Sequence, residues 1–197
     1  QIRYLRGSFN IIGVREAMRR LDAGEPLPAR ALSITFDDGY LDNLTTALPI
    51  MEGLGVPFTV FVPTGGLAAG DMLWWDRTIA ALACTRQPSL DLHEAGLSQA
   101  QDVMSLKGVG RYATVDRVLE QLWGMGLDAA MASVQRIEQL LAPFDASHVF
   151  AHRLAPPQVQ QLRQRGVEIG AHSVHHPNLG MATEELARRE MTESRNY

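Results

Sequence analysis

The sequence has few of the features that mark disulfide-rich, membrane-spanning or nucleic-acid-binding proteins. Cys84 is its single cysteine, so no disulfide can form within the chain. No uninterrupted apolar run approaches the roughly 18 residues that a membrane-spanning helix needs. The 18 Lys and Arg are scattered in a chain whose formal net charge is -4. We therefore expect no transmembrane segment in this chain and no nucleic-acid partner.

The composition is that of an ordinary globular protein. The chain has 197 residues, of which 46% are hydrophobic and 20% charged, enough for one sizeable core or two small ones. It starts at Gln1 rather than at Met, and its first residues lack the basic-then-apolar pattern of a secretion signal. The missing signal does not decide the compartment, so the cell envelope, the periplasm and the cytoplasm all stay open. The oligomeric state is equally open.

Alternating strand and helix signals predict a parallel sheet. Apolar residues at helical spacing predict a helix over Val14–Leu21, and the β-prone run Ala31–Phe36 follows it. A helix is expected next over residues 43–54, with Pro49 near its first turn or at a kink, and then a strand over Pro57–Val62. A strand, a helix and a strand within about 30 residues form a βαβ unit, whose strands are parallel.

The rest of the chain predicts further helices and one more strand. Residues from about 76 to 145 show helical periodicity, which we interpret as a helical insertion. A short helix over Gln158–Arg165 leads into a third strand over Val167–Ala171, and a last helix begins near Thr183. The insertion carries two apolar stripes: Val115, Val118, Leu119, Leu122 and Trp123, and then Val134, Ile137, Leu140 and Leu141.

Two adjacent acids, Asp37 and Asp38, follow the first strand of the βαβ unit. Neighbouring side chains leaving an extended strand point to opposite sides, so one carboxylate can bind an ion while the other addresses a metal-bound water. Adjacent carboxylates also repel each other, and a divalent cation relieves that repulsion. The alternative is that Asp37, Asp38 and Gly39 form an ordinary turn.

Three histidines follow the third strand, at positions 172, 175 and 176. Pro177 disfavours helical backbone at His176, so we expect a loop or a single turn here. Together with Asp38, His172 and His176 make a set of one carboxylate and two imidazoles. Such a set leaves coordination positions for water and substrate, as a catalytic ion requires. The alternative is that these are ordinary surface or core imidazoles, and His175 is not included among the ligands.

Aromatic residues follow the loop after the second strand of the βαβ unit. Trp74 and Trp75 precede Asp76, and an indole ring at this place could form a platform for a sugar ring. Packing in the core is an equally good interpretation of both.

Two motifs resemble those of the polysaccharide deacetylase family, also called the NodB-homology or carbohydrate esterase 4 family. The first motif is Thr35–Tyr40, TFDDGY, followed by Asp42 and Asn43, and the second is His172–Pro177, HSVHHP, after Val167–Ala171. Phe58–Pro63, FTVFVP, lies between them. Met72–Asp76 and the helical insertion further resemble members of the family associated with bacterial surface polysaccharides or exopolysaccharides.

The resemblance implies an α/β fold, namely a distorted (β/α) barrel of the NodB-homology type that is incomplete in this chain. Residues 1–197 would form a single partial deacetylase domain with the helical insertion. A divalent ion, zinc first and Co²⁺, Ni²⁺ or Mn²⁺ as alternatives, would be held by Asp38, His172 and His176. Asp37 would be the general base, and Tyr40 and Trp75 are the candidates for contact with the substrate.

The function implied is a metal-dependent hydrolase that removes N-acetyl, or O-acetyl, groups from an acetylated glycan or polysaccharide. The later motifs of the family, among them a Leu-x-His whose histidine is the general acid, have no match after His176. We therefore expect this chain to be one part of a longer enzyme. Two alternatives stay open: hydrolysis of another amide, such as a formamide or a cyclic imide, and a noncatalytic metal- or carbohydrate-binding fragment.

Overall fold

The computed structural model describes residues 1–98, 102–145 and 152–197, which form two compact units with separate hydrophobic cores. The first unit contains Gln1–Asp71, Ala151–His175 and Glu190–Tyr197. The second contains Met72–Phe150 and His176–Arg189. Residues 99–101, which fall within the segment that the sequence predicts to be helical, lie outside the described residues.

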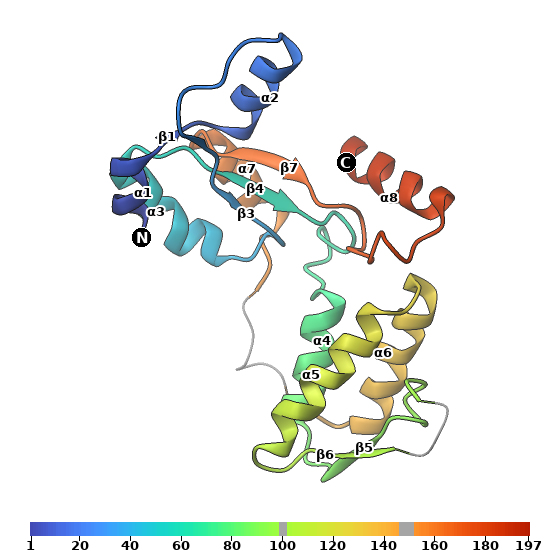
Figure 1. Cartoon of the computed structure of the whole chain (residues 1–197). Helices are drawn as coiled ribbons and strands as arrows, with labels where there is room; N and C mark the ends of the chain where they lie inside the picture. Colours follow the sequence, from blue (N-terminus) through green and yellow to red (C-terminus); the bar gives the residue numbers. More distant parts are fainter. Residues whose placement is uncertain (99–101, 146–151) are drawn as a thin grey trace. The chain divides into compact units, whose positions relative to one another are not determined.

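A three-stranded parallel sheet forms the centre of the first unit (Figure 1). β4 (Thr59–Val62) lies between β3 (Thr35–Phe36) and β7 (Glu168–Ala171), and both pairs are parallel. The predicted βαβ unit is thereby confirmed, since β3 and β4 are parallel neighbours joined by a helical crossover. The third predicted strand, β7, pairs with β4 on its other side.

The run Ala31–Phe36 is not one strand, in contrast to the prediction. Its first part, β2 (Ala31–Leu32), pairs with β1 (Asn10–Ile11), whereas β3 pairs with β4. The backbone shows the change of partner: the N–H of Ile12 donates to the carbonyl of Leu32 at 2.9 Å, and that of Thr59 to the carbonyl of Ile34 at 3.0 Å. β-propensity marks the whole run as extended but does not select the partner of each half.

Two short helices flank β1. α2 (Val14–Asp22) agrees with the helix predicted over Val14–Leu21, and α1 (Ile2–Ser8) was not predicted. Neither helix contains a buried residue. Helical stability in proteins comes mostly from packing of an apolar face. Within the described residues, few tertiary contacts therefore stabilise these two helices.

The crossover from β3 to β4 opens with a π-helical turn, η1 (Asn43–Ala47), and continues as α3 (Leu48–Leu54). The N–H of Leu48 donates to the carbonyl of Asn43, five residues earlier. Pro49 has no N–H and cannot form the usual bond to a carbonyl four residues earlier, so the wide turn lies directly before it. The helix predicted over residues 43–54 is confirmed, with Pro49 in the first turn of α3.

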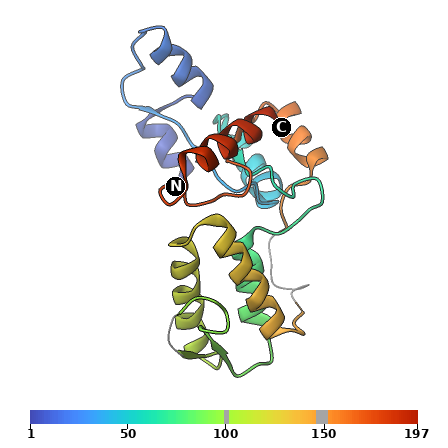
Figure 2. The same ribbon diagram turned by 90° about the vertical axis from the view of Figure 1, so that its right-hand side faces the viewer.

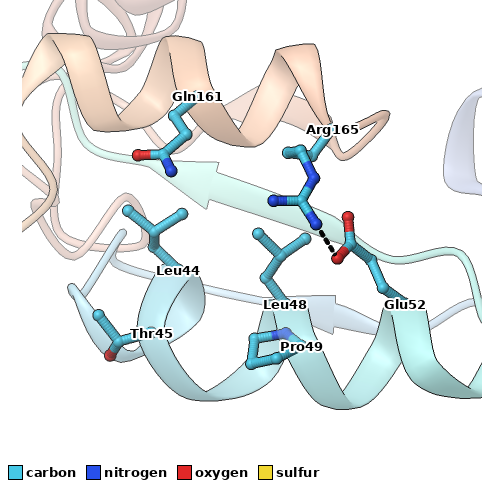
Figure 3. Close-up of a pocket in the computed structure, with 7 residues that line it drawn as sticks. All are labelled: Leu44, Thr45, Leu48, Pro49, Glu52, Gln161 and Arg165. Atoms are coloured by element: carbon cyan, nitrogen blue, oxygen red, sulfur yellow. Dashed lines mark hydrogen bonds and ion pairs between the residues drawn. The ribbon is translucent and has the colours of Figure 1, made fainter.

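The core of the first unit lies between the sheet and two helices, α3 and α7 (Pro156–Gln164). α7 agrees with the predicted helix before the third strand. Figure 3 shows η1 and α3 alongside α7, with a groove between them that Glu52 and Arg165 close by an ion pair. The main buried side chains of this core are Leu48, Met51, Phe58, Val60, Val62, Leu154 and Leu162.

The second unit is mainly helical. α4 (Trp74–Cys84), α5 (Gly110–Trp123) and α6 (Leu127–Leu141) lie against one another, with β5 (Ser89–Asp91) and β6 (Val103–Ser105) at one end of the helices (Figures 1 and 2). The predicted helical character is confirmed except for the antiparallel pair β5–β6, whose three-residue strands are too short to show a period of two. Both predicted stripes reach the core: Val118, Leu122, Val134, Ile137 and Leu141 are almost fully buried.

The last helix, α8 (Glu184–Asn196), begins where the sequence predicts it. The α/β class is confirmed, whereas closure into a barrel is not shown: the sheets of the described residues have two, three and two strands. Among the same residues, no helix is long and apolar enough to cross a membrane.

Candidate metal centre

Three loops of the first unit meet at one edge of its sheet. They follow β3, β4 and β7 and contain Asp37–Tyr40, Pro63–Gly66 and His172–His175 respectively. Because the three strands are parallel, their carboxyl ends share one edge, where ligand-binding residues of such sheets usually lie. The first motif and the loop after β4 therefore lie at the same edge of the sheet.

The turn after β3 has unusual backbone geometry. Asp38 has a φ of 70° and Gly39 a φ of 63°, both in the left-handed region. A Cβ on Gly39 would lie 2.9 Å from Cγ1 of Val62, so the turn packs closely on the end of β4. The backbone of Leu154 donates to Gly39 at 2.8 Å, which holds the turn from the other side. Left-handed backbone at a non-glycine residue is costly and persists where the surroundings enforce it, often at functional sites.

Asp38 and His172 come together over the end of β4. Oδ1 of Asp38 lies 3.7 Å from Nε2 of His172, although β3 and β7 stand two strand spacings apart, about 9.6 Å. The backbone N–H of His172 donates to the carbonyl of Val62 at 3.0 Å, which fixes the start of its loop. Both side chains are half-buried, at 24% and 29% exposed.

The donor pair of Asp38 and His172 fits a divalent ion. Two ligands at 2.0–2.1 Å from a tetrahedral zinc ion stand about 3.3 Å apart, close to the 3.7 Å observed between these two atoms. A carboxylate oxygen and an imidazole nitrogen are both donors that zinc accepts. The donor atoms of the pair therefore suit a divalent ion.

Asp37 and Tyr40 lie on the same turn as Asp38. Asp37 is exposed, as a residue that meets solvent or substrate must be, and Tyr40 is half-buried. The backbone of Tyr40 forms an antiparallel bridge with Arg153, which ties the end of the turn to the segment before α7. The structure thus places both predicted residues at the same edge of the sheet as Asp38.

His176 belongs to the second unit, where aromatic rings surround it. Its ring centroid lies 4.7 Å from that of Trp75 and 5.5 Å from that of Trp123, and its carbonyl accepts a long hydrogen bond from Nε1 of Trp74. Its φ is 54°, again in the left-handed region. The backbone and ring of His176 are therefore held by the tryptophans of the second unit.

Trp75 packs at the edge of the core of the second unit. It is half-buried and makes an edge-on contact with Trp74, with ring centroids 5.2 Å apart. Trp123, which the sequence interpretation assigned only to an apolar stripe, stacks on Trp74 and keeps 40% of its surface exposed. Only the fold reveals this position of Trp123 beside His176.

Arg153 is a second residue that sequence reasoning missed. It is 8% exposed, and its guanidinium donates to the backbone carbonyls of Gly65 at 3.0 Å, Asp71 at 3.2 Å and Pro63. The loop after β4 is therefore held by an arginine that follows it by more than 80 residues. No motif around Arg153 points to this role.

Comparisons with known proteins agree with the motifs. A family model described as Polysaccharide deacetylase matches residues 24–83 and 113–197, which is more than half of the chain. Over 56 residues the chain is 41% identical to the poly-beta-1,6-N-acetyl-D-glucosamine N-deacetylase of Escherichia coli K12, and equally to that of strain O157:H7. These segments make up 28% of this chain and 8% of the relatives.

One solved deacetylase structure is similar in fold to this chain. The Streptococcus pyogenes deacetylase PplD, solved in complex with acetate, has a TM-score of 0.52 and 17% identity over 98% of this chain and 50% of its own. The BpsB deacetylase domain from Bordetella bronchiseptica has a TM-score of 0.43 and 16% identity over 89% of this chain and 42% of its own. The chain thus spans half or less of each protein that it matches, and the likeness to PplD concerns the fold alone.

Proposed function

The chain belongs to the polysaccharide deacetylase family, and from this premise we propose that the protein is a metal-dependent hydrolase of acetyl groups on a polysaccharide or glycan. N-acetyl is the first candidate and O-acetyl the second. The observation that carries the proposal is the 3.7 Å separation between Oδ1 of Asp38 and Nε2 of His172. Both residues lie in segments that the family model matches.

Asp38, His172 and His176 are the proposed ligands. Asp38 and His172 already meet in the first unit, and the chain keeps the Cα atom of His176 within about 14 Å of that of His172, four residues earlier. One carboxylate and two imidazoles suit zinc first, with Co²⁺, Ni²⁺ and Mn²⁺ as alternatives. When bound, such an ion supplies Lewis-acid polarisation of an acyl oxygen and makes water more acidic.

Asp37 is the proposed general base. The side chain of Asp38 is directed toward His172, whereas Asp37 is exposed beside it and can accept the proton of an attacking water at a carboxylate oxygen. A positioned base of this kind contributes about 10²–10⁴-fold to the rate. Tyr40 and Trp75 are the proposed substrate contacts, the first through its hydroxyl and the second through its ring.

The name of the Escherichia coli relatives suggests the first substrate to test. They are called deacetylases of poly-beta-1,6-N-acetyl-D-glucosamine, and their 41% identity to this chain extends over 56 residues. We propose an acetylated amino-sugar polymer of this class as the substrate.

Release of acetate by the full-length protein tests the proposal. The protein is incubated with the N-acetylated polymer in the presence of zinc and after chelation, and free acetate is measured. Asp37→Asn should lose about 10²–10⁴-fold in rate while it still binds zinc. Asp42→Asn is the matched control, because Asp42 is another exposed acid just after the same turn, and it should keep the rate of the wild type.

The outcomes separate the alternatives. No acyl release from any acetylated amino-sugar polymer with zinc supplied would refute the deacetylase. Formate release or opening of a cyclic imide would instead indicate another amide hydrolase. Glycan binding without turnover, unchanged in Asp37→Asn, would indicate a binding protein.

A further inference from the structure

A buried acid from α8 binds the loop that connects His172 to His176. Glu190 is 1% exposed, and its Oε2 accepts hydrogen bonds from the backbone N–H groups of Val174 and His175, both at 2.8 Å. Its Oε1 lies 2.8 Å from Nδ1 of His175. These residues all belong to the first unit. One carboxylate therefore contacts two consecutive residues midway between two proposed ligands.

These contacts account for the burial of Glu190. A carboxylate away from water is costly unless hydrogen bonds satisfy it, and here both oxygens have a hydrogen-bonding partner. Hydrogen bonds to an ionised acceptor are about twice as strong as neutral ones. The loop is thus attached to α8 by strong hydrogen bonds.

The same loop is held from its other side by the loop after β4. The backbone N–H of Thr64 donates to the carbonyl of Ser173 at 3.1 Å, and that of Gly65 to the carbonyl of Val174 at 2.8 Å. Val174 is therefore bound at its N–H by Glu190 and at its carbonyl by Gly65. Ser173, just before it, has a φ of 58°, a strained conformation that persists where contacts of this kind enforce it.

We infer that Glu190 is a positioning residue, which holds the loop between His172 and His176 in the conformation that binds the ion. The inference deepens the proposed function and rests on it, because it takes these histidines as ligands. A loop that is preorganised for the ion loses less conformational freedom when the ion binds. The affinity for the ion therefore depends on the groups that support the ligands as well as on the ligands themselves.

Two substitutions of Glu190 distinguish the role of its side-chain length from the role of its negative charge. Glutamine keeps the length of the side chain and one acceptor oxygen, which can receive both backbone N–H groups, and its amide N–H can donate to a neutral His175 ring. Aspartate keeps the charge but is shorter by about 1.5 Å, so contacts of 2.8 Å would stretch beyond hydrogen-bonding distance. A positioning role therefore tolerates glutamine better than aspartate, whereas a role of charge in attracting the ion gives the opposite order.

The experiment compares the full-length wild type with Glu190→Gln, Glu190→Asp and Ser194→Ala. Ser194 is the matched control, because it is 4% exposed on the same helix and its hydroxyl bonds only to the carbonyl of Met191 in the contacts described. The first measurement is zinc affinity by competition with a chelator. The second is amide hydrogen exchange at Val174 and His175 in the ion-free protein.

We expect Glu190→Asp to weaken zinc binding by about 10–100-fold, the usual effect of losing a group that supports ligands, and to speed exchange at both amides. Glu190→Gln and Ser194→Ala should stay within a factor of a few of the wild type. Zinc affinity of Glu190→Asp equal to that of the wild type would overturn the inference. So would loss of affinity in Glu190→Gln alone.

Two further outcomes are decisive. If the wild type binds no zinc, the proposed function fails together with the inference, which the wild-type titration shows before any variant is compared. If Glu190→Asp does not fold, His175→Ala takes its place, since it removes only the side-chain contact of Glu190. Weaker zinc binding and faster exchange at Val174 would support the inference, and unchanged affinity would overturn it.

Discussion

The backbone of Gly65 lies directly against the backbone of Val174. Its N–H donates to the carbonyl oxygen of Val174 at 2.8 Å, and a Cβ on Gly65 would stand 2.7 Å from the same oxygen. Real side chains do not approach a carbonyl so closely, so the loop after β4 and the loop of the histidines can touch only because residue 65 is glycine. This contact connects the two loops that flank the proposed metal centre.

Gly65→Ala should therefore destabilise the protein. The added methyl group forces the two loops apart, and inserting a methyl into a filled space costs about 1–3 kcal/mol. Urea unfolding measures the loss of free energy. Gly53→Ala is the control, since nothing lies within 4 Å of a Cβ at this position in α3 and alanine favours helix by about 0.5–1 kcal/mol. Equal stability of Gly65→Ala and the wild type would contradict the contact.

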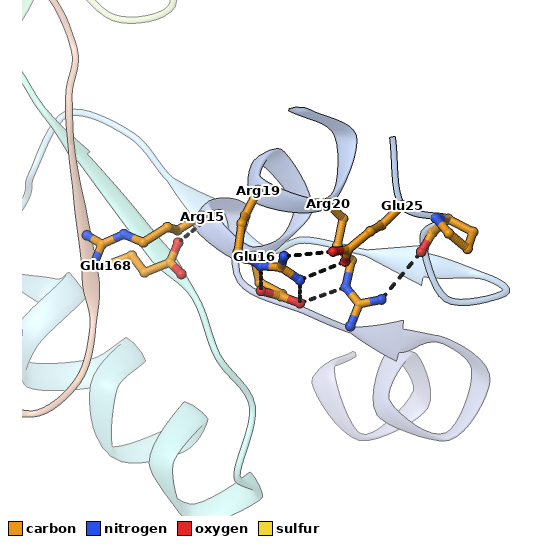
Figure 4. Close-up of polar contacts among 7 residues, drawn as sticks. Arg15, Glu16, Arg19, Arg20, Glu25 and Glu168 are labelled. Atoms are coloured by element: carbon orange, nitrogen blue, oxygen red, sulfur yellow. Dashed lines mark hydrogen bonds and ion pairs between the residues drawn. The ribbon is translucent and has the colours of Figure 1, made fainter. Parts of the chain in front are cut away.

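Glu168 connects β7 to the start of α2 (Figure 4). Its Oε2 accepts hydrogen bonds from the hydroxyl of Thr59 at 2.8 Å and from the backbone N–H of Arg15 at 3.1 Å. Thr59 is buried, so Glu168→Ala leaves its hydroxyl without this acceptor and should lower the free energy of unfolding by about 1–3 kcal/mol.

The control for Glu168 is Glu52→Ala. Glu52 is ion-paired with Arg165 at the surface (Figure 3), and such pairs contribute about 0–1 kcal/mol. Chemical denaturation of both variants gives the comparison. A cost for Glu168→Ala no greater than that for Glu52→Ala would show that the contacts of Glu168 do not stabilise the fold.

Glu16 should make stability depend on pH in the acid range. Hydrogen bonds from Arg19 and Arg20 lower the pKa of Glu16 from its ordinary 4.5 to about 2. A lowered pKa in the folded state means that the stabilisation is complete above about pH 4.5 and is lost as the pH falls toward 2. The melting temperature of Glu16→Gln should thus lie below that of the wild type at neutral pH. The two melting temperatures should converge as the pH falls from about 4.5 to about 2.

Thermal melts over pH 2–7, about the range set by this shift, test the prediction. Glu193→Gln is the control, because Glu193 is an exposed acid on α8. A difference between wild type and Glu16→Gln that persists unchanged at pH 2 would contradict it. Added salt should reduce the difference at neutral pH, since the three side chains lie near the surface.

Zinc should stabilise the folded protein through Asp38. An ion that binds only the folded state adds about 2.7 kcal/mol at a free concentration one hundred times its dissociation constant. Asp38→Asn should remove most of this gain, because the amide is a weaker ligand than the carboxylate, while asparagine still tolerates the left-handed backbone at this position.

Urea unfolding with zinc and with a chelator measures the gain. Asp42→Asn should show the same gain as the wild type, because Asp42 lies outside the proposed ligand set. If zinc stabilises Asp38→Asn as much as the wild type, Asp38 is not a ligand of the ion. The main support for the proposed function would then be lost.

Much of the order of the helices and strands was predictable because local sequence patterns specify it. Helical spacing predicted α2 and the stripes of α5 and α6, prolines at the start and a glycine at the end predicted α7, and β-prone runs before turns predicted β4 and β7. The short elements were not predictable: β1, β5 and β6 have two or three residues each, too few to show a repeated alternation of apolar and polar side chains. The pairing of residues 31–32 with β1 and of residues 35–36 with β4 was not predictable either, because β-propensity does not specify which strands pair.

The sequence by itself determined that acids and imidazoles follow the ends of parallel strands, because motif, turn and strand are neighbours along the chain. Only the tertiary structure decided that Asp38 and His172 meet at 3.7 Å and that Glu190 and Arg153 hold the surrounding loops. These contacts join residues far apart in sequence, and their geometry follows from strand pairing and burial rather than from any local pattern.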